Sequence, residues 1–91
     1  MTNNQVIDEL KVILEERFGI RYGVNYDENK IAMASLTWNM SAVMLYEFLL
    51  IIEDQYDVDF SYDDVQNRGF HNLDEISRLV CYYLSKNQNK V

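Results

Sequence analysis

The apolar residues of the chain recur at steps of three and four, which is the spacing of one face of an α-helix. In the first segment this face consists of Val6, Ile7, Leu10, Ile13, Leu14 and Phe18. Asn3 or Asn4 can cap the start of such a helix, and Gly19 can close its end in the left-handed conformation. The pattern therefore predicts a first helix over about residues 4–18.

The periodicity disappears between residues 19 and 40, and we predict a long loop over this stretch. Apolar residues in its second half are expected to hold the loop against the core: Ile31, Met33, Leu36 and Trp38. A loop of about twenty residues is unusual in a compact domain and points either to a function or to a special fold.

The periodic pattern returns after Ser41, and a second helix is expected over about 41–56. Its core face is predicted to contain Leu45, Phe48, Leu49, Ile52 and Tyr56. Further on, Ser61 and Asp64 have the three-residue spacing of a capping box, which predicts a short helix over about 61–67.

Gly69 is expected to end the short helix, and Asn72 and Glu75 repeat the capping pattern for a last helix over about 72–86. The core face of the last helix is predicted to contain Leu73, Ile76, Val80, Tyr83 and Leu84. Residues 87–91 are polar and expected to fray. No strand-like alternation persists, so the fold class is all-α, with three longer helices and one short helix.

The length of 91 residues predicts one small domain, 1–91. Eight basic and fifteen acidic residues give a net charge of −7, which disfavours nucleic acid and anionic membranes and favours a protein partner with a basic face. The single Cys81 excludes an intrachain disulfide and suits a reducing compartment. Residues 1–5 are polar and lack the pattern of a signal peptide, so we expect a cytoplasmic domain.

The sequence offers no convincing active site. His71 and Cys81 lie on different segments, and no third residue is placed to orient a nucleophile pair. Four aspartates suggest a calcium loop, but the glycine and the terminal glutamate of such a loop are missing: Asp57, Asp59, Asp63 and Asp64. We expect no catalytic residue and no metal site.

The order of elements from Ser41 to Glu75 resembles the second half of an acyl carrier protein. Residues 47–60 are similar to the second helix of that family and its exit, and residues 70–76 to the start of its last helix. The resemblance implies an acyl carrier protein-like four-helix bundle with a long first loop.

Acyl carrier proteins begin the second helix with Asp-Ser-Leu and attach 4′-phosphopantetheine to that serine. A gapless match puts Ser41 at the position of the aspartate, Ala42 at that of the modified serine, and Val43 at that of the leucine. Serine replaces aspartate naturally as a helix cap, and alanine has no hydroxyl to modify. This register implies that no cofactor is carried. A shift of one residue instead makes Ser41 the attachment site of a true carrier of acyl or aminoacyl thioesters.

The run from Trp38 to Phe48 and the pair Gly69-Phe70 also look like acyl carrier-related proteins encoded beside bacterial peptide-maturation enzymes. That resemblance implies a role in making or tailoring a ribosomally produced peptide, and it does not define the biochemical activity. We expect a monomeric, non-catalytic module that docks on a basic-faced partner enzyme. The expected contact residues on the second helix are Met44, Tyr46, Glu47, Glu53 and Asp54. Acidic residues there would steer the partner, and apolar ones would make the contact. Alternatively, Met44 packs against the loop and Tyr46 covers its edge.

Overall fold

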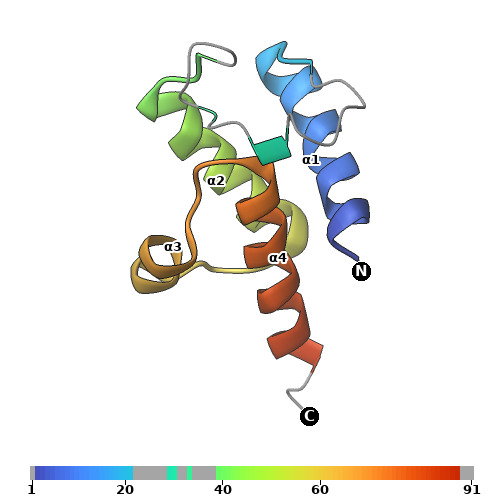
Figure 1. The fold of residues 1–91 in the computed structure, drawn as a ribbon, viewed down its shortest axis with the longest axis vertical. Helices are drawn as coiled ribbons and strands as arrows, with labels where there is room; N and C mark the ends of the chain where they lie inside the picture. Colours follow the sequence, from blue (N-terminus) through green and yellow to red (C-terminus); the bar gives the residue numbers. More distant parts are fainter. Residues whose placement is uncertain (1, 22–28, 31–32, 34–38, 89–91) are drawn as a thin grey trace.

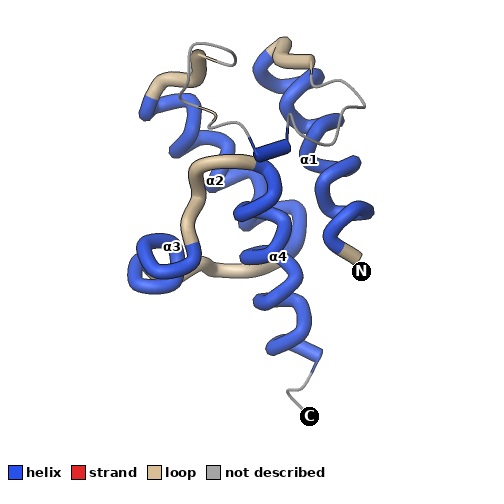
Figure 2. The backbone as a smooth tube through the Cα atoms, in the orientation of Figure 1, coloured by secondary structure: helices blue, strands red, loops and turns tan. Residues whose placement is uncertain are grey.

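The computed structural model describes residues 2–21, 29–30, 33 and 39–88, and this part of the chain contains helices and no strand. The helices are α1 (Asn3–Phe18), α2 (Ala42–Tyr56), α3 (Tyr62–Arg68) and α4 (Leu73–Gln88) (Figure 1). The predicted all-helical class, with three longer helices and one short helix, is confirmed. Figure 2 shows α1 on one side of α4 and α3 on the other. Within the described residues, no helix is both long and apolar enough to cross a membrane.

The hydrophobic core is built from one face each of α1, α2 and α4, together with two methionines of the α1–α2 connection. Its buried members are Val6, Ile7, Leu10, Ile13, Leu14, Met33, Met40, Phe48, Ile52, Leu73, Ile76 and Val80. A smaller cluster of Val58, Leu79 and Tyr83 lies next to α3. Met33 is buried as predicted, whereas the predicted anchors Ile31, Leu36 and Trp38 lie outside the described residues.

The cap of α1 differs from the prediction. Thr2 precedes the helix, and its hydroxyl accepts a hydrogen bond from the Gln5 backbone N–H at 3.2 Å, while the Gln5 side chain accepts from the Thr2 N–H at 2.9 Å. The prediction of Asn3 or Asn4 is wrong because this reciprocal pair satisfies two backbone donors at once. Gly19 ends α1 with a φ of +67°, as predicted.

The last helix is longer than predicted, since α4 continues to Gln88 rather than ending at residue 86. The added residues are Asn87 and Gln88, and their polarity alone does not end a helix. Residues 89–91 of the predicted frayed tail lie outside the described part of the chain.

A polar contact joins the end of α2 to α1. The Tyr56 hydroxyl donates to a carboxylate oxygen of Glu9 at 2.5 Å. Burial and the neighbouring carboxylate raise the pKa of Tyr56 well above its ordinary value, because both disfavour a phenolate there. This hydrogen bond joins the last residue of α2 to α1.

Candidate protein-interaction face on α2

Helix α2 has two apolar faces, and the fold covers only one of them. Phe48 and Ile52 are fully buried, whereas Val43, Tyr46 and Leu50 are 67%, 61% and 47% exposed. These three exposed residues are spaced at i, i+3 and i+7, so they share one stripe opposite the core face. Such a contiguous apolar stripe on a surface helix indicates an interaction site more than solitary exposed residues do.

Acidic side chains accompany this stripe. Glu47 and Asp54 are exposed on the same side of α2, and the helix has no lysine or arginine. We call Val43, Tyr46, Glu47, Leu50 and Asp54 together the α2 outer face.

The excess negative charge of the whole chain comes from one segment that includes α2. Between Lys30 and Arg68 there is no basic residue, and the segment has seven acidic ones: Glu47, Glu53, Asp54, Asp57, Asp59, Asp63 and Asp64. The rest of the chain has eight acidic and eight basic residues. Two copies of the α2 outer face would bring like charges together, whereas a basic surface would be attracted to it.

The five predicted contact residues do not all belong to this face. Tyr46, Glu47 and Asp54 do. Met44 is half-buried and packs against the core. Glu53 is half-buried as well, and its carboxylate accepts a hydrogen bond from the Phe60 backbone N–H at 2.8 Å, which holds the connection between α2 and α3.

Sequence analysis missed Val43 and Leu50 as members of the outer face. Their signal was present, because the stripe that starts at Val43 lies opposite the residues Phe48 and Ile52 that the same analysis placed in the core. Because α2 is apolar on most sides, its sequence pattern does not distinguish the buried face from the exposed one.

Ser41 is the N-cap of α2, as the sequence suggested. It has extended backbone angles, and its Oγ accepts a hydrogen bond from the Met44 N–H at 3.2 Å. Ala42 is the first helical residue and is exposed. A phosphopantetheine arm needs a hydroxyl, which Ala42 lacks, so Ser41 is the single residue of 39–44 to which the arm could be attached.

Beyond the exit of α2, the Tyr83 hydroxyl ties α3 to α4. It accepts a hydrogen bond from the Ser61 N–H at 2.9 Å and donates to Asp64 Oδ2 at 2.5 Å. The Ser61 side chain accepts from the Asp64 N–H at 3.1 Å, so half of the predicted capping box is present. In the other half of such a box the Asp64 side chain would accept from the Ser61 N–H, and here the Tyr83 hydroxyl accepts this bond instead. Its hydrogen bond is the largest factor that lowers the pKa of Asp64, and the Ser61 hydroxyl and the charges of Lys86 and Arg68 lower it further.

Replacing Tyr83 with Phe should raise the pKa of Asp64 toward its ordinary value, and an NMR titration of the Asp64 carboxyl carbon measures this. Because the folded-state pKa is depressed, Asp64 stabilises the fold above its unfolded-state pKa, and this stabilisation disappears as pH falls through the folded-state pKa. The stability difference between the wild type and Tyr83→Phe should therefore shrink in acid. The exposed Tyr62, replaced in the same way, is the control. An unchanged Asp64 titration in Tyr83→Phe would contradict this assignment.

The residues weighed for catalysis are far from a reactive arrangement. Burial raises the pKa of the Cys81 thiol, which disfavours the thiolate nucleophile. His71 is exposed, and its Nδ1 lies 3.2 Å from Glu75 Oε1, within its own turn of the chain. The described residues include no group of three or more His, Cys, Asp or Glu side chains placed to hold a metal ion.

Comparisons with protein-family models, curated protein sequences and solved structures gave no match for this chain.

Proposed function

We propose that the chain is an acyl carrier protein-related interaction module that docks on a partner enzyme through the α2 outer face. In this proposal the module is non-catalytic, monomeric and cytoplasmic, carries no cofactor, and acts in the maturation of a bacterial ribosomal peptide. The exposed apolar stripe of Val43, Tyr46 and Leu50 is the observation that supports it most.

The chemistry of this face describes the partner. Apolar side chains at the centre of an interface supply most of its affinity, and charges around them steer the encounter and reject wrong partners. The α2 outer face combines three apolar residues with Glu47 and Asp54 and lies in a segment without basic residues. The complementary surface is an apolar patch edged with lysine or arginine on a protein.

The cap of α2 supports the gapless register with acyl carrier proteins. Ser41 performs the capping that the family assigns to its aspartate, and Ala42 takes the position of the modified serine. The second candidate function is a true carrier with 4′-phosphopantetheine on Ser41. It is favoured by the exposure of Ser41 at the start of α2, where a transferase can reach the hydroxyl.

Docking can be tested by calorimetry with the peptide-maturation enzyme that the proposal implies as the partner. Tyr46→Ala and Leu50→Asp should each weaken binding by tenfold or more, because truncating a central interface residue costs about 2 kcal/mol. Glu47→Lys with Asp54→Lys should slow association and reduce its dependence on salt, since both changes remove attraction to a basic partner.

Val12→Asp is the matched control, because Val12 is a 53% exposed apolar residue on α1, away from α2. It should leave the affinity unchanged. If the Tyr46 and Leu50 variants bind as tightly as Val12→Asp does, the partner does not use the α2 outer face.

A further inference from the structure

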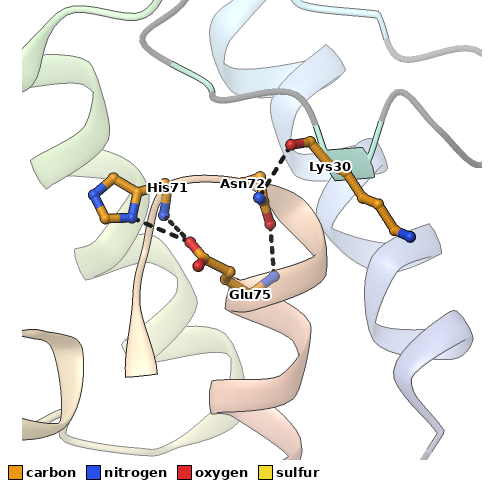
Figure 3. A network of polar contacts seen from close by, with 4 residues as sticks. All are labelled: Lys30, His71, Asn72 and Glu75. Atoms are coloured by element: carbon orange, nitrogen blue, oxygen red, sulfur yellow. Dashed lines mark hydrogen bonds and ion pairs between the residues drawn. The ribbon is translucent and has the colours of Figure 1, made fainter. Parts of the chain in front are cut away.

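Three hydrogen bonds connect the start of α4 to the start of α2, although about thirty residues separate the two helix starts in the sequence. The Asn72 side-chain amide donates to the Lys30 carbonyl at 3.1 Å (Figure 3). The Met33 N–H donates to the His71 carbonyl at 2.7 Å, and the Met40 N–H donates to the Met33 carbonyl at 3.0 Å. Met40 directly precedes Ser41, the N-cap of α2. Lys30 and Met33, two of the described residues of the α1–α2 connection, are thus hydrogen-bonded to the segment that begins α4, and Met40 is bonded to Met33.

The segment from Gly69 to Glu75 makes its own hydrogen bonds at the start of α4. Asn72 Oδ1 accepts a hydrogen bond from the Glu75 N–H at 2.8 Å, which caps α4. The Glu75 carboxylate accepts from the His71 N–H at 2.9 Å and lies against Gly69 (Figure 3). Half of the predicted capping pattern is therefore present, because the glutamate side chain accepts from the His71 N–H rather than from the Asn72 N–H. These bonds direct the His71 carbonyl toward Met33.

Asn72 performs two tasks with one amide group. Its oxygen caps α4, which a serine or aspartate would do equally well. Its nitrogen donates to Lys30, which an aspartate cannot do because it has acceptors only. A serine has a donor, but its single oxygen cannot take the positions of both the amide oxygen and the amide nitrogen. The two tasks together therefore distinguish asparagine from these other caps.

We infer that Asn72 is a positioning residue for the start of α2: its amide N–H and the His71 carbonyl hold the α1–α2 connection, and through Met33 and Met40 they set the first turn that presents Val43 and Tyr46. The coupling between the two helix starts is a property of the fold. Its consequence for docking rests on the proposed function.

The test is amide hydrogen exchange, measured by NMR on the full chain with Asn72→Asp. This variant keeps the cap of α4 and removes the donor to Lys30. We expect protection to fall about tenfold at the Met33 and Met40 amides, the factor that the loss of one hydrogen bond produces, with a smaller fall at Leu45 in α2. The Ile76 amide of α4 should keep its wild-type protection.

Two further variants make this result decisive. Asn72→Ser keeps a cap for α4 without adding charge. It should reproduce the same loss of protection, which would show that the lost donor causes it and that repulsion by the carboxylate of Asn72→Asp does not. Ser61→Ala removes the cap of α3, where Ser61 bonds to Asp64 and Tyr83, and should leave Met33 and Met40 protected. Wild-type protection of Met33 and Met40 in both Asn72 variants would overturn the proposal.

The docking consequence is measured separately. Binding of the maturation enzyme to Asn72→Asp should weaken together with the loss of protection in α2. If the enzyme does not bind through the α2 outer face at all, the proposed function fails while the exchange result stands. If binding depends on Tyr46 and Leu50 but exchange at Met40 is unaffected, the inference on Asn72 fails while the proposed function stands.

Discussion

Replacing Phe48 with Ala should lower the free energy of unfolding by about 3–5 kcal/mol, as the truncation of a buried aromatic residue in a core typically does. Phe48 is fully buried. Its ring lies 6.0 Å from that of Phe18 in an edge-to-face arrangement and 6.4 Å from that of Phe70. It therefore joins α2 to the end of α1 and to the segment that leads into α4. The loss is a large fraction of the total stability of a small domain.

Urea denaturation followed by circular dichroism measures this loss from the shift in midpoint. Val43→Ala is the matched control, because Val43 is on the same helix but 67% exposed. It should change the free energy of unfolding by less than about 0.5 kcal/mol. A comparable loss in both variants would mean that α2 does not bury the face that the structure assigns to the core.

Replacing Gly69 with Ala should cost about 2–4 kcal/mol, for two reasons that add. Gly69 has a φ of +91° and a ψ of 152°, a region that residues with a Cβ adopt only at about 1–3 kcal/mol. An added Cβ would also lie 2.6 Å from Glu75 Oε2. The carboxylate would have to move, and its hydrogen bond with the His71 N–H would be lost or weakened.

Gly19 is a control for the cost of a positive φ without a clash. Its φ is +67°, and among the described residues no atom beyond its chain neighbours lies within 4 Å of an added Cβ, so Gly19→Ala should cost only about 1 kcal/mol. In a Glu75→Ala background the clash is absent, and Gly69→Ala should then cost less than in the wild type, which a double-mutant cycle measures. Equal costs for the two glycines would show that the Glu75 carboxylate does not lie against Gly69.

Local rules predict most of the helical framework. The α1 face from Val6 to Phe18 follows from its spacing alone, and Ser41, Ser61 and Asn72 mark the starts of three helices because their side-chain oxygens accept bonds from backbone donors. These signals depend on residues three or four apart, which is why a single sequence contains them.

The contacts between distant segments could not be predicted in this way. The hydrogen bonds from the Asn72 amide to Lys30, from the Phe60 N–H to Glu53, and from the Ser61 N–H to Tyr83 depend on where the helices and their connections lie in space. For the same reason the sequence placed Glu53 among the partner contacts, since an acidic residue on a helix looks solvent-facing until the fold supplies its donor.

The proposed function depends on whether this chain carries a thioester or only docks on a partner. We would incubate the folded protein with coenzyme A and a broad-specificity phosphopantetheinyl transferase, measure its intact mass, and map any modification by fragmentation. The matched variant is Ala42→Ser, which places a hydroxyl at the first helical residue of α2.

If the chain only docks, we expect no gain in mass for the wild type. Ala42→Ser should gain one phosphopantetheine unit on residue 42. A gain on Ser41 of the wild type, abolished in Ser41→Ala, would contradict the proposed function and make this chain a carrier.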